Sequence, residues 1–425
     1  MDSEIKKRIA QIRRGEVPEG YKKTKYGILP ADWTVYILGD CLSRIEKPVK
    51  VNPNEWYTQI GIRSHGKGLF YKEPVTGAEL GNKAVYWVQP DCFVLNIVFA
   101  WEQAIGKTSQ AEAGMIGSHR FPMYRPINDK IDIDYLIAYL LTKRGTDILE
   151  MASPGGAGRN RTLGQEHFLK SKVVFPSVAE QQKIAAILTT QDKVIELKEK
   201  RLAEKLRQKK YLMQQLLTGK KRLPGFAGKW KAYRLHEIVK HRTRRNDIGN
   251  TNVLTISAQF GLINQADFFN KAIASDDKSN YFLLKKDDFA YNKSYSSGYP
   301  FGAIKRLTRY DVGIVSPLYI CFRRKSENVS GIFLEQYFDA GLMNHEIRAF
   351  AQEGARNHGL LNIGVDDFFN SKIILPSLDE QSAIAQVLST ADREISLLRQ
   401  DIEQEKQKKK ALMQLLLTGI VRVCP

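Results

Sequence analysis

Two stretches of the chain carry apolar residues at the spacing of a long amphipathic helix. Leucine and isoleucine recur at multiples of seven residues in each stretch, at Leu188, Ile195, Leu202 and Leu216 in the first and at Leu388, Ile395, Ile402 and Leu416 in the second. A sevenfold apolar repeat is the pattern through which helices pack as a coiled coil. The pattern predicts two long helices, with Lys209 and Lys409 as charged interruptions of the stripe.

The ends of both predicted helices are visible in the sequence. Ser177–Glu180 and Ser377–Glu380 fit the capping box, and Gly219 and Gly419 stand where a glycine ends a helix. A helix over 178–218 would be about 60 Å long at roughly 1.5 Å per residue. A helix of that length needs a packed partner. We expect the two helices to pack against each other as an antiparallel coiled coil; the alternative is that each packs on its own domain.

The chain is a tandem duplication. Pro176–Arg222 and Pro376–Arg422 align without a gap, and 21 of these 47 positions are identical, which makes chance similarity improbable. The repeat extends to the blocks before each helix, where Trp33 corresponds to Trp230 and the offset varies by a few residues. Each copy therefore consists of a divergent domain followed by a nearly invariant helix.

The divergent blocks have a mixed composition. Residues 87–88, 92–99 and 314–322 are rich in aromatic and branched side chains and predict strands, whereas 133–141 and 331–338 predict short helices. We therefore expect an α+β fold with two pseudo-repeated α/β domains. The predicted boundaries are an N-terminal helical segment at 1–20, domains at 21–170 and 222–370, and long helices within 171–221 and 371–425.

Charge indicates a polyanionic partner. The chain of 425 residues holds 65 Lys and Arg against 46 Asp and Glu, a formal net charge of +19. Such an excess favours nucleic acid binding, although a basic surface without a partner is the plainer alternative. No apolar run is long enough to cross a membrane, and the N-terminus has no secretory pattern, so we expect a cytoplasmic protein without membrane contact.

No catalytic motif is present in the sequence. The seven histidines form no HExxH pair, the glycines form no phosphate-binding loop, and neither a Glu-x-Lys nuclease motif nor a DPPY-like methyltransferase motif occurs. The four cysteines are far apart and form no CxxC pair. We therefore expect a chain that is not an enzyme and that holds no metal or cofactor.

Loop clusters of basic and amide residues are the candidate DNA-binding residues. Arginine and asparagine or glutamine can bind base edges in a bidentate way, and lysine and serine often hold phosphates. Each residue alone is better explained as a phosphate contact or a bystander than as a base contact, but the clusters recur on equivalent loops of both copies. The candidates are Arg63, Ser64, His65, Lys67, Arg159, Asn160, Arg161, Gln259, Asn292, Lys293, Tyr295, Arg356, Asn357 and His358.

Several motifs resemble one known family. The chain has P-S-x-x-E-Q-x-x-I-A-x-x-L from Pro176 and again from Pro376, and each long helix ends in L-M-Q-x-L-L-T-G. The segments before Trp33 and Trp230 are similar to the entries into that family's recognition domains. In these features the chain resembles the specificity subunit of type I restriction–modification systems. Residues 5–14 give only a faint echo of the helix ending, so we do not expect the N-terminus to close a ring.

The resemblance implies a division of labour between subunits. Each target-recognition domain would read one half of a bipartite site in double-stranded DNA, and the long helices would set the spacer and dock two methyltransferase subunits. S-adenosylmethionine would belong to those partners, and ATP and magnesium to motor-endonuclease subunits. Two other readings remain open at this point: a fused nuclease or methyltransferase with an unrecognised site, and a coiled-coil adaptor that reads no sequence.

Overall fold

The computed structural model describes residues 3–155, 161–257, 260–269, 277–295, 298–353 and 361–423. The chain divides into two compact units. The first unit consists of residues 1–198 with 401–425, and the second of residues 199–400. The long helices α6 (Val178–Leu216) and α12 (Leu378–Leu416) therefore each contribute one part to each unit.

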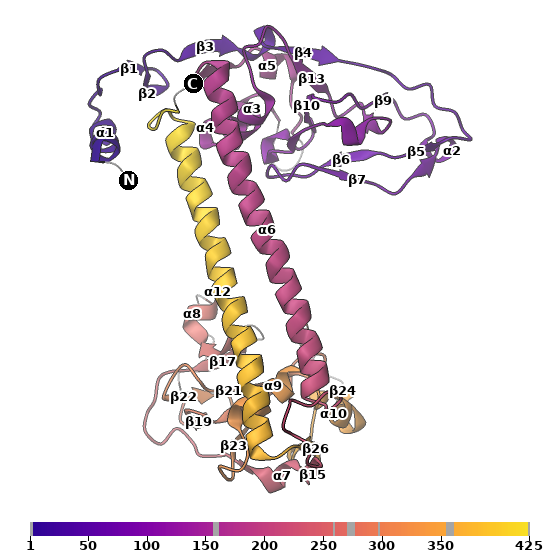
Figure 1. Ribbon diagram of the computed structural model, residues 1–425, viewed down its shortest axis with the longest axis vertical. Helices are drawn as coiled ribbons and strands as arrows, with labels where there is room; N and C mark the ends of the chain where they lie inside the picture. The colour runs from indigo at the N-terminus through magenta and orange to yellow at the C-terminus, as the bar shows by residue number, and fades with distance from the viewer. Residues whose placement is uncertain are drawn as a thin grey trace. The chain divides into compact units, whose positions relative to one another are not determined.

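The first unit combines short strands with short helices (Figure 1). Its helices are α1 (Ser3–Arg13), α2 (Gly77–Leu80), α3 (Ile133–Leu140), α4 (Lys143–Met151) and α5 (Gln165–Leu169), with 3-10 turns η1 (Leu38–Asp40), η2 (Ala100–Glu102) and η3 (Gln110–Glu112). Its strands are β1 (Tyr21–Thr24), β2 (Gly27–Pro30), β3 (Thr34–Ile37), β4 (Leu42–Ile45), β5 (Trp56–Tyr57), β6 (Ile60–Ile62), β7 (Leu69–Tyr71), β8 (Val75–Thr76), β9 (Val85–Trp87), β10 (Phe93–Leu95), β11 (Ile105–Lys107), β12 (Ile116–Ser118), β13 (Met123–Pro126) and β14 (Lys172–Phe175).

The second unit has elements of the same kinds. Its helices are α7 (Leu235–Ile238), α8 (Gln265–Phe269), α9 (Gly331–Asp339), α10 (Asn344–Phe350) and α11 (Val365–Asn370). Its strands are β15 (Lys231–Arg234), β16 (Val239–His241), β17 (Leu254–Ser257), β18 (Gly261–Asn264), β19 (Phe282–Lys285), β20 (Phe289–Asn292), β21 (Ala303–Arg306), β22 (Val312–Val315), β23 (Ile320–Arg324), β24 (Gln352–Glu353), β25 (Leu361–Asn362) and β26 (Lys372–Leu375).

The same four-stranded antiparallel sheet forms the centre of each domain. Its strand order is β11-β10-β13-β4 in the first unit and β21-β20-β23-β16 in the second. The register also repeats, because Phe93 lies opposite Tyr124 and Phe289 lies opposite Phe322. These buried aromatic pairs fill both cores. The duplication predicted from sequence is therefore a duplication of fold, and the predicted α+β class is confirmed.

Two predicted strands are shorter than the apolar runs that suggested them. The run 92–99 gives only β10, because the side chain of Asn96 bonds the backbone and turns the chain. The run 314–322 gives two strands, because Pro317 lacks an amide hydrogen and the amide of Tyr319 bonds the carbonyl of Ser316 in a turn. Apolar composition predicted the burial of these segments better than their conformation.

Each globular core is completed by both long helices. In the first unit, Ile184 and Leu188 of α6 pack with Leu416 and Leu417 at the end of α12. In the second unit the two helices have the opposite roles: α12 contributes Ile384 and Leu388 from its beginning, and α6 contributes Leu216 and Leu217 from its end. The two predictions for the helix stripes therefore both hold in part, because the outer leucines pack into the domains as well as against the partner helix.

Ion pairs show that the helix segments run antiparallel within each unit. In the first unit, the Nζ atom of Lys409 lies 2.6 Å from Asp192, and the Nζ atom of Lys198 lies 2.8 Å from Asp401, so residue numbers rise on one helix as they fall on the other. In the second unit, Lys205 pairs with Glu394 at 2.7 Å and Lys209 pairs with Asp392 at 2.5 Å, so residue numbers again rise on one helix as they fall on the other.

The stripe residues are buried to different extents. Ile195 and Ile402 are buried, and Leu202 is half-buried. The lysine interruptions have partners, because Lys209 pairs with Asp392 just as Lys409 pairs with Asp192. Each lysine therefore occupies a position of the apolar stripe, and its ammonium group pairs with a carboxylate on the facing helix.

The predicted capping boxes are half right. The hydroxyl of Ser177 accepts a hydrogen bond from the amide of Glu180, at 3.4 Å. The carboxylate of Glu180, however, is buried and accepts two hydrogen bonds of 2.8 Å from Arg422. Arg222 binds Glu380 in the same bidentate way, with distances of 2.5 and 2.6 Å. The glutamate of the repeated motif therefore anchors the segment that follows the other helix.

The end of the chain is also tied to its beginning. Tyr21 donates a hydrogen bond to the carbonyl of Gly419 at 2.6 Å, and Arg8 of α1 donates to that of Ile420 at 2.9 Å. The N-terminal segment therefore contacts the C-terminal segment, which sequence alone did not lead us to expect. Within the described residues, no helix has both the length and the apolar character needed to cross a membrane.

Candidate nucleic-acid interface

An asparagine turn ends the central strand of each domain. After β10, the side-chain oxygen of Asn96 accepts a hydrogen bond from the amide of Val98 at 3.1 Å. At the end of β20, Asn292 makes the same bond to the amide of Ser294, also at 3.1 Å. Asparagine favours this turn because its short side chain mimics a backbone carbonyl. The two turns occupy equivalent places in the two domains.

A short pair of backbone segments, here called the arginine ribbon, lies beside each turn. Gly155 bridges to Arg161 in the first unit, and β24 pairs with β25 in the second. The amide of Leu163 bonds the carbonyl of Ile97 at 2.8 Å, and the amide of Leu361 bonds that of Lys293 at 3.1 Å. The segments between these flanks contain the predicted residues Arg159 and Asn160 in one domain and Arg356, Asn357 and His358 in the other, and all five lie outside the described residues. Their flanks are nevertheless fixed next to Asn96 and Asn292.

The candidate residues near position 65 converge on η2 of the first unit. The amide of His65, which has a positive φ of 61°, bonds the carbonyl of Glu102, and the hydroxyl of Ser64 bonds the Glu102 carboxylate at 3.0 Å. The guanidinium of Arg161 lies over the ring of Trp101 in the same turn. This loop and the base of the arginine ribbon are therefore neighbours.

The remaining members of this cluster differ in how they are held. The guanidinium of Arg63 lies 5.0 Å from the centre of the Phe70 ring and also bonds the carbonyl of Leu69. Stacking on a ring restrains the arginine, and its second outer nitrogen, Nη2, is not used in the bond to Leu69. Lys67 is exposed. The hydroxyl of Ser64, in contrast, is already engaged by Glu102.

The candidates of the second unit are less concentrated. Asn292 and Lys293 are half-buried at the turn, and Tyr295 is 63% exposed. Gln259 lies outside the described residues. The structure therefore brings Asn292 and Lys293 next to the base of the second unit's arginine ribbon, and it leaves Tyr295 at the surface.

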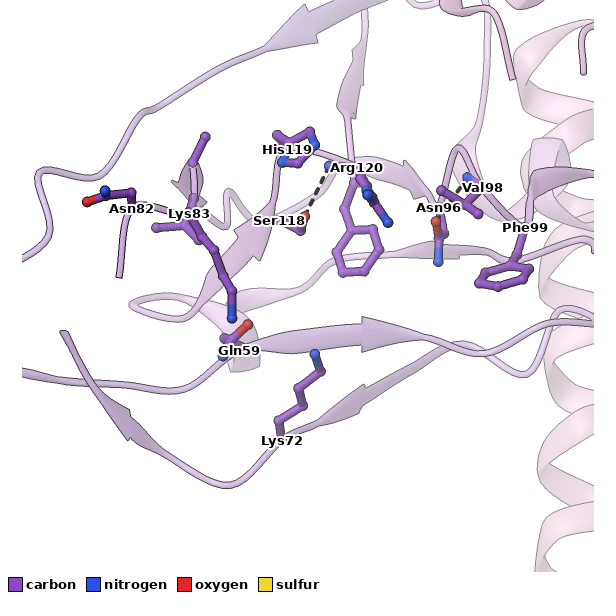
Figure 2. A pocket seen from close by; sticks show the side chains of 13 residues that line it. Gln59, Lys72, Asn82, Lys83, Asn96, Val98, Phe99, Ser118, His119 and Arg120 are labelled. Atoms are coloured by element: carbon purple, nitrogen blue, oxygen red, sulfur yellow. Dashed lines mark hydrogen bonds between the residues drawn. The ribbon is translucent and has the colours of Figure 1, made fainter. Parts of the chain in front are cut away.

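Sequence reasoning missed a basic cleft in the first unit. A cavity of about 670 Å³ is lined by cations and amides from several loops (Figure 2). Its polar lining includes Gln59, Lys72, Lys83, Asn96, His119 and Arg120. These residues are dispersed over more than sixty positions and form no motif, so no local signal in the sequence marked them. Asn96 links this cleft to the turn described above.

A buried carboxylate organises two arginines in the second unit, at a site that sequence reasoning also missed. Asp288 is 2% exposed, and burial raises the pKa of its carboxyl above the ordinary value. It accepts a hydrogen bond of 2.7 Å from the amide of Lys285 and one of 2.5 Å from Arg323, and Arg242 lies at 3.9 Å. Both arginines remain partly exposed. This arrangement fixes the direction of two guanidinium groups on the domain surface.

The polar side chains of these features suit the binding of an anion. The polar side chains at the turns, ribbons and cleft are hydrogen-bond donors and cations, which match phosphates and base edges. Over the described part of the chain, no three His, Cys, Asp or Glu residues come together in a group able to hold a metal ion.

Comparison with known proteins places the chain in a family. The family model for the type I restriction modification DNA specificity domain matches residues 67–207 and 228–407. Two specificity subunits of type I restriction enzymes from Methanocaldococcus jannaschii, MjaX and MjaVIII, are each 24% identical to this chain. The alignments cover 95% of this chain and 97% and 96% of those proteins.

Solved structures show the same fold. The HsdS subunit from Thermoanaerobacter tengcongensis has a TM-score of 0.50 at 16% identity, over 92% of this chain and 98% of that one. The S subunit of the type I restriction-modification system from M. genitalium has a TM-score of 0.53 at 10% identity, over 90% and 96% of the two chains. The chain therefore belongs to the type I restriction-modification DNA specificity family, and its function is to give such a system its DNA sequence specificity.

Proposed function

We propose that each domain of this specificity subunit reads one half of a bipartite DNA site. The observation that carries the proposal is the repeated interface: both domains have one sheet register, one asparagine turn and one arginine ribbon joined to it. Two domains that read different half-sites need the same sheet but different loop side chains, because side chains and not the fold contact the bases.

The test is a domain exchange. Residues 21–170 are replaced by the equivalent block of a family member with a different target, and the chain is expressed with its partner subunits. Sequencing of the methylated motif should show one half-site changed and the other kept. The matched control exchanges 222–370 and should change the opposite half. A motif in which both halves change, or neither, contradicts the proposal.

The long helices are proposed to dock two methyltransferase subunits. Leu197 of α6 is 65% exposed in the first unit, and Leu397 of α12 is 59% exposed in the second, at equivalent positions of the repeat. These are the most exposed large apolar side chains of the two helices and stand at matching positions of both copies, which makes them the candidate partner contacts. Because each unit carries one, the repeat suits two copies of one partner. Leu197→Arg and Leu397→Arg should each remove one methyltransferase in native mass spectrometry, and the double variant should remove both; retention of both partners contradicts this docking face.

We further propose that the helices set the length of the unread spacer. Four residues inserted after Lys200 lengthen a helix by about 6 Å, which corresponds to one or two base pairs of DNA. The methylated motif of the variant should keep both half-sites and gain one or two spacer pairs. An active variant with its original spacer would assign that role to another part of the complex.

The chain is proposed to act without chemistry of its own, in the cytoplasm, as part of a larger complex. S-adenosylmethionine would be held by the methyltransferase subunits, and ATP and magnesium by motor-endonuclease subunits. The purified full chain should bind its motif in double-stranded DNA without cleaving or methylating it. Methyl transfer by the purified chain alone would favour the alternative of a fused enzyme.

A further inference from the structure

The cleft of the first unit is walled by three cations from separate loops. Lys72 follows β7, Lys83 lies between α2 and β9, and Arg120 lies between β12 and β13. In Figure 2 the ends of Lys72 and Lys83 extend toward the space beside Gln59, and Arg120 is seen between Ser118 and Asn96. Three separate loops therefore direct positive charge into one cavity.

The lining has no negative charge to balance these cations. Besides the three cations, the polar lining consists of amides, one hydroxyl and one histidine, and none of the lining residues is acidic. Among the described residues, Lys72, Lys83 and Arg120 take part in no ion pair. Uncompensated cations that converge in a concave site create a positive potential that attracts an anionic ligand.

The backbone that holds these side chains is closely connected. The amide of Lys72 bonds the carbonyl of Gln59 at 2.9 Å, and the amide of His119 bonds that of Ala84 at 3.2 Å. These bonds join the loop of each cation to a neighbouring wall of the cleft. The long side chains can move, but the loops that carry them are fixed to one another.

The cleft is continuous with the candidate interface. The amide of Ile97 bonds the carbonyl of Arg120 at 3.0 Å, and the carbonyl of Ile97 accepts the bond from Leu163 at the base of the arginine ribbon. Asn96 contributes to the lining of the cleft and to the turn. An anion in the cleft would therefore lie close to the residues proposed to read DNA.

We propose that this cleft holds the sugar–phosphate backbone of the DNA at the half-site bound by the first unit, with Lys72, Lys83 and Arg120 as phosphate ligands. This proposal rests on the proposed DNA-reading function of the domain. DNA is the anion favoured here because the cleft is part of the same surface as the arginine ribbon, and because lysines hold phosphates as point charges without demanding a base sequence. The three cations therefore contribute affinity and position, and the neighbouring loops contribute sequence preference.

The experiment measures the binding of the full chain to two duplexes over a range of salt concentrations. One duplex contains the motif found by sequencing methylated DNA from cells that express this chain with its partners, and the other has a random sequence of equal length. The test variant is Lys72→Ala/Lys83→Ala/Arg120→Ala. The matched control, Lys6→Ala/Lys7→Ala/Arg13→Ala, removes the same charge from α1, a helix with no buried residue.

The phosphate role predicts a specific pattern. The test variant should bind both duplexes about tenfold to a hundredfold more weakly, and the slope of log affinity against log salt should fall by roughly two to three, near 0.9 per lost phosphate contact. The control should keep a slope close to that of the unaltered chain. The charge-retaining variant Lys72→Arg/Lys83→Arg/Arg120→Lys should also keep it, which separates charge from folding.

Three outcomes would overturn the proposal. One is an equal loss in the test and control variants, which would mean that only net charge matters. Another is an unchanged slope in the test variant while the unaltered chain still prefers its motif; in that case the cleft assignment fails and the reading function stands. The third is saturable binding of free dAMP that the test variant loses while its duplex affinity is unchanged, which would assign the cleft to a nucleotide. Absence of any motif preference in the unaltered chain would instead contradict the proposed function.

Discussion

The two recognition domains contain sheets of the same strand order, but these sheets differ at one equivalent position. In the second unit, Asp288 lies just before Phe289 and binds Arg323 from the neighbouring strand. In the first unit, the residue before Phe93 is Cys92, and the opposite Arg125 donates instead to the carbonyl of Pro90 at 3.3 Å. The aromatic pair one residue further along the strand is kept in both.

This difference shows how a duplicated frame can acquire different surfaces. The buried aromatic pairs fix the register of the sheet, so the residues at the ends of its strands can change without loss of the core. A buried aspartate gives the second unit two oriented arginines, and the first unit has a basic cleft near the other end of the equivalent strand. The two domains therefore differ at both ends of this strand, while the aromatic pair between these ends is kept.

The two units also differ in how their closing segments are joined. In the second unit, Arg222 follows α6 directly and its guanidinium lies over Trp230, a few residues later in the same chain. In the first unit, Arg422 comes from the end of the chain and binds both Asp32 and Glu180. In the first unit, therefore, the segment that carries this arginine is joined to the domain by side-chain contacts and does not continue into it along the chain.

The largest expected effect comes from breaking the ion pairs Arg422–Glu180 and Arg222–Glu380. Arg422→Met should destabilise the first unit by about 3 kcal/mol, because it leaves the buried Glu180 without its cation. Arg222→Met should destabilise the second unit in the same way, because it leaves the buried Glu380 without its cation. Hydrogen exchange should increase in β3 and β14 for the first variant and in β15 and β26 for the second.

The matched control for these two variants is Arg399→Met at an exposed position of α12, which should change stability by less than about 0.5 kcal/mol. The double variant Arg422→Met/Glu180→Gln should recover part of the loss, because the buried charge is gone. Increased exchange spread equally over both units, or none, would contradict independent closure.

A smaller effect is expected from the two arginine loops. Arg159→Ala and Arg356→Ala should each weaken specific DNA binding by about 1–3 kcal/mol if the arginine reads a base. Each loss should fall on one half-site only, which mutated half-site duplexes would reveal. A uniform loss on all sequences, with the salt slope lower by about one, would instead assign the arginine to a phosphate. Unchanged binding in both variants would remove these loops from the interface.

The repeat is the part of the fold that sequence predicts best. The helices from Val178 and Leu378, the glycines that end them and the duplicated domains all follow from local patterns that need no knowledge of distant contacts. The ion pair of Glu180 does not follow from a local pattern, because its partner Arg422 is 242 residues away in the sequence. A capping motif predicts only hydrogen bonds to nearby backbone. In the folded chain this carboxylate instead forms an ion pair with a distant arginine.

The candidate site was predictable only in part, for a similar physical reason. The cluster around His65 and the ribbon residue Arg161 stood out because basic residues are adjacent in sequence, and the structure brings both to η2. Lys72, Lys83 and Arg120 were missed because each is an isolated cation on a loop. Only the folded sheets place them around one cavity.

The smallest expected effect concerns an ionic network that only the first unit has. The carboxylate of Glu405 on α12 accepts hydrogen bonds from Lys198 at 2.8 Å and from Gln191 at 2.7 Å, both on α6. The positions that correspond to Lys198 and Glu405 in the other copy are Leu398 and Lys205, so the second unit cannot form this network. The hydrogen bond from Lys198, followed by that from Gln191, lowers the pKa of Glu405 to about 2.

A carboxyl whose pKa is lower in the folded than in the unfolded chain stabilises the fold above its unfolded pKa. That stabilisation is lost as pH falls through the folded pKa. The contribution of Glu405 should therefore be complete above about pH 4.5, its ordinary value, and should vanish near pH 2. In the full chain with isotope-labelled glutamate, the resonance of Glu405 should titrate near pH 2. Lys198→Met should move that midpoint up toward 4.5, whereas Lys193→Met, at an exposed position of the same helix, should leave it in place. The stability difference between Lys198→Met and the unaltered chain should shrink as pH falls through this window. A midpoint that stays near pH 2 without Lys198 would mean that Gln191 and the surrounding charges suffice, and that the contrast between the two units does not depend on this pair.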